Sequence, residues 1–265
     1  MKFIAISIIF LFIQTSYANP KLHNKPIKLR IVGGTEVKLE DLEAKSTVSL
    51  RRENGGLINN CTGTLIHKRL VLTAAHCVAN HTTVNVENLY VGFGLAKPSW
   101  VDSSDSEVKF VTLETGRIHP EYTTNGVDIA LIKLSQDAPK GWKPVEIESD
   151  ASVLKKGTEV ILAGYGLRSY NPLLNAGSLY KVTVKIAETE KNAPYLFNYA
   201  FFGGGGCQGD SGGPGYIQDG NKLKLLGVIS GGDRDCLGRG FLSSVPYVAE
   251  WISKMAVELI EEGSL

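Results

Sequence analysis

Short runs of apolar and β-branched residues alternate with glycine and polar turn residues along most of the chain. Runs of this length and spacing are typical of strands in an antiparallel sandwich or barrel. Strands do not alternate regularly with helices, so a doubly wound parallel sheet is not favoured. The expected strands are Thr47–Arg51, Gly63–Ile66, Leu70–Ala74, Leu89–Phe93, Val108–Leu113, Ile129–Leu134, Glu159–Ala163, Leu179–Ile186 and Leu223–Ser230.

The pattern changes to helical spacing at Pro246, near the C-terminus. Apolar residues then recur three and four positions apart, at Val248, Trp251, Ile252, Met255 and Leu259. This stripe predicts a helix over about residues 246–262 that packs on the strands, with the proline tolerated in its first turn. Its polar face is not basic, which disfavours a helix lying on a membrane.

The first 30 residues have a different character. Lys2 precedes an apolar run over residues 3–13, and small residues follow up to Ala18, which predicts a signal peptide over residues 1–18. The alternative is a membrane anchor, but eleven apolar residues extend only about 16 Å as a helix, about half of a bilayer core. We therefore expect a secreted, extracellular protein with a polar, basic leader over residues 19–30.

Composition and charge exclude several classes of protein. The chain has 265 residues, of which 43% are hydrophobic and 21% charged, so it can bury a large core and is not a disordered tail. Basic and acidic residues number 28 and 27, and five of the basic ones lie within the first 30 residues. The remainder is mildly acidic, so neither nucleic acid nor a membrane is expected as a partner.

Four cysteines, Cys61, Cys77, Cys207 and Cys236, are present in a chain expected to be secreted, where disulfides persist. Their spacing leaves three pairings open. It contains no C-x-x-C unit, which disfavours a zinc site. We expect no metal and no cofactor.

Two N-glycosylation motifs begin at Asn60 and Asn80. The motif at Asn80 lies in a polar stretch and is the better candidate for a glycan. The motif at Asn60 contains Cys61, so an unused site is an equal alternative there.

A candidate nucleophile is Ser211, in the G-x-S-x-G pattern of residues 209–213, which exposes a serine on a sharp turn. A neutral hydroxyl needs a base, usually an imidazole. None of the five histidines follows Ser211, which excludes the order Ser, acid, His of an α/β-hydrolase esterase. His76, at the end of an apolar run and before Cys77, is the preferred base.

A candidate acid is Asp128, which begins the apolar stretch of residues 128–134. An acid attached to a buried strand can hold the tautomer of an imidazole. The chain order is then His76, Asp128, Ser211, which points to nucleophilic catalysis.

Five motifs together resemble the chymotrypsin/trypsin-fold serine endopeptidases, in family order across nearly all of residues 31–252. The resemblance implies an all-β fold of two antiparallel six-stranded Greek-key barrels with a C-terminal α-helix. The peptidase domain would cover residues 31–265, with barrels over about 31–140 and 141–245. The motifs are Ile31-Val32-Gly33-Gly34, Leu72-Thr73-Ala74-Ala75-His76-Cys77, Asp128-Ile129-Ala130-Leu131, Gly164-Tyr165-Gly166 and Gly209-Asp210-Ser211-Gly212-Gly213-Pro214.

The resemblance also implies catalytic roles. Ser211 would be the nucleophile, and His76 the general base and then the general acid. Asp128 would orient His76, and Ser230 matches the family serine that hydrogen-bonds to this acid. The backbone N–H groups of Gly209 and Ser211 would form the oxyanion hole.

By resemblance, residues 230–232 match the strand that pairs with substrate backbone. Gly231 stands where tryptophan is usual, so that wall would be more open. Gly205 occupies the floor of the specificity pocket, where trypsin-like members have aspartate, and Gly232 and Gly240 line its walls. An uncharged pocket that admits aromatic or large aliphatic side chains is therefore expected.

Two disulfides follow from the same resemblance, Cys61–Cys77 and Cys207–Cys236. A third bridge that is common in the family has no cysteines here. The stretch of residues 187–206, before the nucleophile, is short and ends in four glycines, so the shape of the pocket does not carry over from the family.

The resemblance also implies that the protein is activated by proteolysis. Residues 19–30 would be an activation propeptide, removed after Arg30 so that the new amino group of Ile31 pairs with Asp210. Gly205 argues against self-cleavage after arginine, so a separate trypsin-like activating protease is expected. Other expected partners are protein or peptide substrates and protein inhibitors of a monomeric enzyme, and the alternative is a non-catalytic homologue that acts by binding.

Overall fold

The structure is a computed structural model of the chain. The residues that it describes are 34–54, 57–95, 108–166, 178–189, 196–200, 205–233, 236 and 239–262. The expected signal peptide, the leader, Arg30 and Ile31 lie outside these residues.

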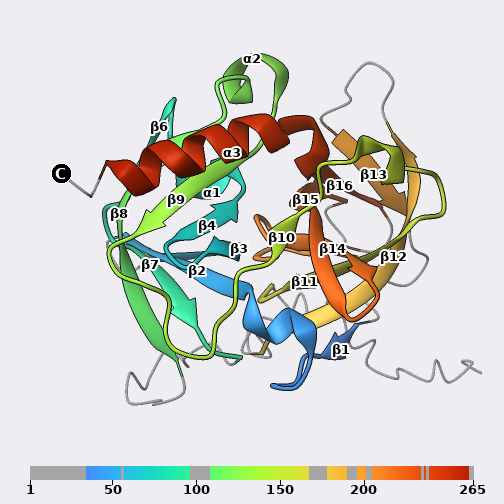
Figure 1. Cartoon of the computed structure of the whole chain (residues 1–265), viewed down its shortest axis with the longest axis horizontal. Helices are drawn as coiled ribbons and strands as arrows, with labels where there is room; N and C mark the ends of the chain where they lie inside the picture. Colours follow the sequence, from blue (N-terminus) through green and yellow to red (C-terminus); the bar gives the residue numbers. More distant parts are fainter. Residues whose placement is uncertain are drawn as a thin grey trace, which may run out of the picture.

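Six antiparallel strands form the first closed barrel, in the order β2-β3-β4-β9-β8-β7 (Figure 1). Alternate side chains, among them Val48, Leu65 and Val91, point inward and fill its core. The strands are β2 (Thr47–Asn54), β3 (Leu57–His67), β4 (Leu70–Thr73), β7 (Leu89–Phe93), β8 (Lys109–Ile118) and β9 (Ala130–Leu134).

Six further antiparallel strands form the second barrel, in the order β12-β11-β14-β15-β16-β13, and pairing of β13 with β12 closes it. Two short strands join this sheet, β1 (Thr35–Glu36) on β12 and β10 (Glu146–Ile147) parallel to β15. The barrel strands are β11 (Glu159–Gly164), β12 (Tyr180–Thr189), β13 (Leu196–Ala200), β14 (Pro214–Asp219), β15 (Lys222–Gly232) and β16 (Arg239–Ser244).

The C-terminal helix α3 (Val245–Glu261) leaves the second barrel and runs back across the first (Figure 1). Ser244 caps it by accepting a hydrogen bond from the Tyr247 N–H, and Pro246 lies in its first turn. The remaining elements are short: η1 (Leu42–Lys45), α1 (Ala75–Val78), β5 (Ala79–Asn80), β6 (Thr83–Val84), α2 (Tyr122–Asn125) and η2 (Ala151–Val153).

Two buried tyrosines join the barrels. The Tyr165 hydroxyl, on the second barrel, donates to the Gly94 carbonyl at 2.7 Å. The Tyr216 hydroxyl lies 2.8 Å from the Ser46 hydroxyl and 3.0 Å from that of Thr47. Because a buried hydroxyl left without a partner is costly, these contacts fix how the barrels meet.

The fold class predicted from the sequence is confirmed, with two closed six-stranded barrels and a C-terminal helix. All nine expected strands are present, whereas three strands of the second barrel, β13, β14 and β16, and the two-residue strands β1, β5, β6 and β10 were not predicted. In the described ranges, no helix has the length and apolar character needed to cross a bilayer.

Candidate active site

His76 and Asp128 meet at one end of the first barrel. Strand β4 pairs antiparallel with β9, with Thr73 opposite Ala130, so residues that follow β4 lie beside residues that precede β9. His76 lies in α1, directly after β4. Its Nδ1 is 2.6 Å from Oδ2 of Asp128, and its backbone N–H donates to Oδ1 at 2.9 Å.

The carboxylate of Asp128 is buried and hydrogen-bonded on both oxygens. The Ser230 hydroxyl of the second barrel donates to Oδ2 at 2.7 Å, and Asp128 is only 6% exposed. Burial alone would raise the pKa of Asp128, but the hydrogen bonds and the charge of His76, together with Ser230, lower it below its ordinary value. Asp128 is therefore an anion that holds the imidazole in one orientation.

The same contact sets the basicity of His76. Burial by itself would lower the pKa of His76, but the hydrogen bond and the negative charge of Asp128 raise it above the ordinary value of a histidine. Because Nδ1 faces Asp128, Nε2 is the nitrogen that can exchange a proton with another group. The side chain is 37% exposed, so other groups can reach the ring.

Ser211 lies on a tight turn that docks against the first barrel. Its carbonyl accepts a hydrogen bond from the Thr62 N–H at 2.8 Å, and the Thr62 hydroxyl donates to the Gly209 carbonyl at 2.9 Å. Gly212 has a φ of 79°, and a Cβ there would lie 2.1 Å from Oγ1 of Thr73. Only glycine allows this approach, which brings Ser211 to the barrel that carries His76.

His76 and Ser211 share one surface hollow of about 420 Å³. It lies where the two barrels meet, and both contribute to its lining, so the expected base and nucleophile face the same solvent space. The lining residues are Leu50, Arg52, Asn60, Cys61, His76, Cys77, Ala79, Leu89, Gln208, Gly209 and Ser211.

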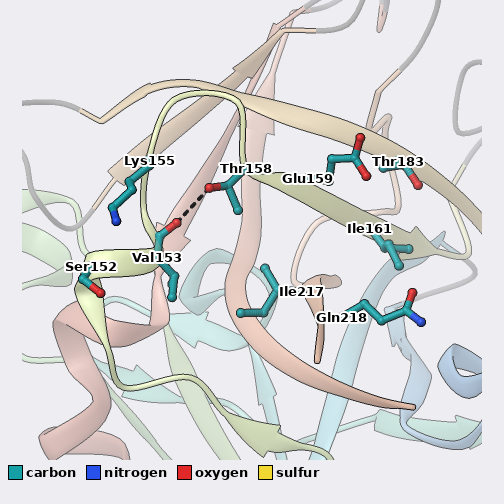
Figure 2. Close-up of a pocket in the computed structure, with 9 residues that line it drawn as sticks. All are labelled: Ser152, Val153, Lys155, Thr158, Glu159, Ile161, Thr183, Ile217 and Gln218. Atoms are coloured by element: carbon teal, nitrogen blue, oxygen red, sulfur yellow. Dashed lines mark hydrogen bonds between the residues drawn. The ribbon is translucent and has the colours of Figure 1, made fainter. Parts of the chain in front are cut away.

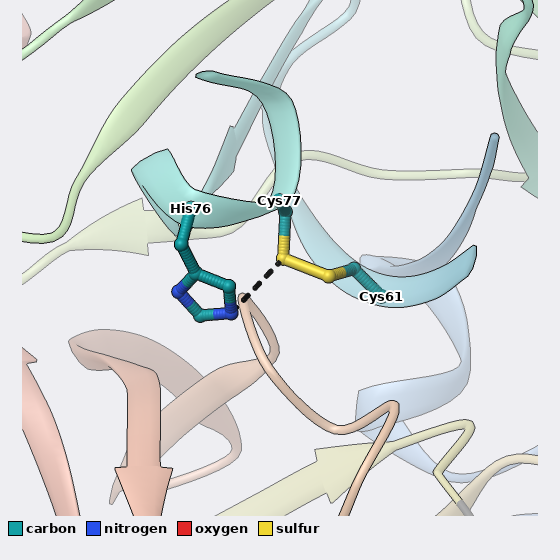
Figure 3. A group of neighbouring side chains, drawn as sticks. All are labelled: Cys61, His76 and Cys77. Atoms are coloured by element: carbon teal, nitrogen blue, oxygen red, sulfur yellow. Dashed lines mark hydrogen bonds between the residues drawn. A yellow bond between two sulfur atoms is a disulfide. The ribbon is translucent and has the colours of Figure 1, made fainter. Parts of the chain in front are cut away.

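Both expected disulfides are present, and each lies beside the candidate site. Cys61 of β3 is bonded to Cys77 of α1, next to His76, and Cys207 is bonded to Cys236 (Figure 3 shows the first). The Cys77 sulfur lies 3.7 Å from Nε2 of His76. Cys61, His76 and Cys77 have the spacing of a metal-ligand set, but the sulfurs are bonded to each other and are not thiolates.

Asp210, next to the expected nucleophile, is fully buried. Its carboxylate accepts hydrogen bonds from the N–H groups of Gly166 and Cys207, both at 2.8 Å. A Cβ on Gly164 would lie 2.2 Å from Oδ1 of Asp210. The Gly164-Tyr165-Gly166 motif thus makes room for this carboxylate.

Two of the predicted pocket glycines, Gly205 and Gly240, lie next to a residue that the sequence interpretation missed, Tyr199. Gly232 pairs with Gly240 between β15 and β16, and a Cβ on Gly205 or Gly240 would lie within 3.0 Å of the Tyr199 ring. A Cβ on Gly231 would meet nothing within 4 Å, so this wall is open. The signal for Tyr199 was the apolar run before the four glycines, which was not interpreted as a strand.

The two expected glycosylation positions differ in surroundings. Asn80 is exposed, in β5. Asn60 lines the hollow that contains His76 and Ser211, where a glycan would obstruct access. Of the two positions, Asn80 thus has the more accessible surroundings.

A second hollow, of about 520 Å³, lies on the outside of the second barrel (Figure 2). Its lining combines Lys155 and Glu159 with the apolar side chains of Val153, Ile161 and Ile217, and it includes neither histidine nor cysteine. It shares no residue with the first hollow, which contains His76 and Ser211.

Two closed barrels with a histidine–carboxylate pair and a serine at their junction define a protein of the chymotrypsin/trypsin fold. The family model described as Trypsin matches residues 31–252, and the chain belongs to this family of serine proteases. It is 33% identical over 216 residues to Hypodermin-A of Hypoderma lineatum, covering 77% of each chain.

Other relatives are more distant. Trypsin of Sarcophaga bullata is 27% identical over 247 residues, which cover 87% of this chain and 90% of the relative. Chymotrypsin-like elastase family member 1 of Homo sapiens is 28% identical over 218 residues, covering 76% and 81%. The names of these relatives include both trypsins and an elastase, so they do not fix the substrate of this chain.

Proposed function

We propose that the protein is a secreted serine endopeptidase that is made as a zymogen and hydrolyses peptide bonds through an acyl-enzyme. The observation that carries the proposal is the 2.6 Å contact between His76 and the buried Asp128, in a hollow that also contains Ser211. The three residues act as base, orienting acid and nucleophile.

The arrangement of these residues supports a specific role for each of them in the proposed hydrolysis. Nε2 of His76 takes the proton of the Ser211 hydroxyl as its oxygen attacks the substrate carbonyl, and Asp128 stabilises the resulting imidazolium. The N–H groups of Gly209 and Ser211 donate to the oxygen that becomes negative. His76 then gives its proton to the leaving amine, and water, activated in the same way, hydrolyses the acyl-enzyme.

Substrates of the proposed enzyme are proteins or peptides with an uncharged side chain before the scissile bond. Gly205 provides no carboxylate for arginine or lysine, and the carboxylate of Asp233 accepts a hydrogen bond from the Arg239 N–H within its own turn. The glycines alone favour large apolar side chains, a chymotrypsin-like preference. The extended backbone of substrate pairs with Ser230, Gly231 and Gly232, as an added strand.

Covalent labelling tests the proposal directly. A serine-directed organophosphorus reagent is expected to label Ser211 in the chain cleaved after Arg30, because only an activated serine reacts with such reagents. Mass spectrometry of the labelled peptide identifies the residue. If Ser211 stays unlabelled, the protein is a non-catalytic homologue that acts by binding.

The pH dependence of the proposed reaction follows from the raised pKa of His76. Catalysis needs neutral Nε2, so kcat/KM is expected to rise with pH through a midpoint above about 6.5, the ordinary value for histidine. The His76–Asp128 pair stabilises the fold most below the unfolded pKa, where His76 is charged, and this stabilisation is lost as the pH rises through the folded pKa.

Activity and this contribution to stability therefore have opposite trends with pH. A series of kcat/KM values measured between pH 5 and 9 with one peptide substrate locates the midpoint. A midpoint at or below that of an ordinary histidine would contradict the assignment of His76 as a base held by Asp128.

A further inference from the structure

Tyr199 of β13 is a large side chain that contacts two of the proposed pocket residues, Gly205 and Gly240. It is paired across the sheet with Gly240 of β16, and it is only 1% exposed. Its hydroxyl accepts a hydrogen bond from the Gly206 N–H at 2.7 Å. The ring thus extends from one wall of the pocket to the loop that forms its floor.

The distances at the neighbouring glycines show how closely the Tyr199 ring packs against the backbone. A Cβ on Gly240 would lie 2.2 to 2.4 Å from three atoms of the Tyr199 ring and hydroxyl, and one on Gly205 would lie 3.0 Å from the ring. A real Cβ atom essentially never comes within 3.0 Å of another heavy atom, so the ring packs directly on the backbone at Gly240. The space that these glycines leave open is filled by Tyr199.

Exposure shows how deep the pocket remains. Gly231 and Gly232 are exposed, whereas Gly205 and Gly240 are buried together with the tyrosine. The surface that is open to solvent at Gly231 and Gly232 therefore does not extend to Gly205 and Gly240, because the buried Tyr199 ring occupies the volume next to those two glycines.

We propose that Tyr199 determines the specificity of the enzyme, by blocking the deep end of the pocket so that cleavage follows small aliphatic residues such as alanine or valine. The inference rests on the proposed peptidase function and narrows its substrate class. It replaces the preference for aromatic and large aliphatic side chains that the glycines alone suggest.

The chemistry of the ring fits an uncharged substrate. Burial raises the pKa of Tyr199 to about 12, so the phenol is neutral at physiological pH. A neutral hydroxyl that already accepts from the Gly206 N–H offers no charge partner to arginine or lysine. Tyr199 therefore disfavours basic side chains by charge and large side chains by volume.

The test compares hydrolysis of matched peptides that differ only in the residue before the scissile bond. The full chain is activated with immobilised trypsin, which is then removed. The wild-type enzyme is expected to cleave after alanine or valine at least about tenfold more efficiently than after phenylalanine, since a single methylene in a pocket is worth about 10- to 200-fold. Tyr199→Ala is expected to reverse this ratio in kcat/KM.

Two variants control for effects on the fold. Tyr199→Phe keeps the ring and is expected to keep the wild-type ratio. Phe197→Ala truncates another fully buried aromatic residue of β13, which packs on Gly227 away from the pocket, and is expected to lower stability without changing the ratio. A change of ratio in Phe197→Ala equal to that in Tyr199→Ala would overturn the assignment.

The cleavage preference of the wild-type enzyme tests the role of Tyr199 even if the Tyr199→Ala variant does not fold. Dominant wild-type cleavage after phenylalanine or tyrosine would show that the ring does not block the pocket. The organophosphorus label, applied to the same preparation, separates the two proposals. Labelled Ser211 with aromatic preference overturns the role of Tyr199 alone, whereas absence of the label overturns the peptidase function.

Discussion

Replacing Ser211 by alanine is expected to lower kcat on a peptide substrate by about 10⁴- to 10⁶-fold, the range known for serine peptidases. The change removes the hydroxyl that His76 is proposed to activate, and no other described residue that lines the shared hollow carries a hydroxyl. His76→Ala is expected to lose a similar factor, because the nucleophile and its base act as one unit. Steady-state measurement of kcat for the wild type and the variants with one peptide substrate gives the factor.

The matched control is Ser253→Ala, which removes an exposed serine hydroxyl of α3 that donates to the Ala249 carbonyl. It is expected to retain wild-type kcat. Thermal unfolding of Ser211→Ala should show that the fold is intact. Peptidase activity of Ser211→Ala near that of the wild type would disprove the mechanism.

The candidate catalytic pair and most of the scaffold could be predicted from the sequence. His76 and Asp128 each adjoin an apolar run, and those runs became β4 and β9, which pair side by side and bring the two residues into contact. Local patterning was therefore enough to identify candidates. Their contact depends on strand pairing, which periodicity does not specify and which here came from the resemblance to a family.

Three unpredicted strands of the second barrel show where local patterning fails. Strand β14 begins with Pro214 and Gly215, and β16 contains Gly240 near its start, so both include residues that ordinarily mark turns. In these two strands tertiary pairing overrides the low strand propensity of proline and glycine. Strand β13 has strand-forming residues, but it is short and is followed by a stretch with four glycines, which is typical of a loop.

Missing β13 had a direct consequence for the interpretation of specificity. Gly205, Gly232 and Gly240 were recognised as pocket residues, and glycines alone suggest empty space. What fills that space is a side chain from a strand about six residues upstream of the floor, placed there by its pairing with Gly240. The volume of a pocket depends on how the whole barrel packs, so it cannot be predicted from the residue types at single positions.

Activation by proteolysis is the second large effect that we expect. Asp210 is fully buried beside Ser211, and the N–H groups of Gly166 and Cys207 hold its carboxylate. We propose that cleavage after Arg30 creates an amino group on Ile31 that pairs with Asp210. Removing either member of a buried ion pair costs about 3–5 kcal/mol, so the new pair can order the turn of residues 205–211 and its oxyanion donors.

Cleavage of the wild-type chain by trypsin is therefore expected to raise kcat/KM by about 100- to 5,000-fold, the factor that this energy allows. Arg30→Gln diverts trypsin to Lys28, which leaves Leu29 at the new N-terminus, two residues too long, and this product is expected to stay inactive. Asp210→Asn is expected to be cleaved normally after Arg30 and to stay inactive as well, because the amino group of Ile31 then has no charged partner. N-terminal sequencing of each product, together with its kcat/KM, tests whether activity depends on a free amino group at Ile31. Full activity in a chain that still carries residues 19–30 would contradict activation by cleavage after Arg30.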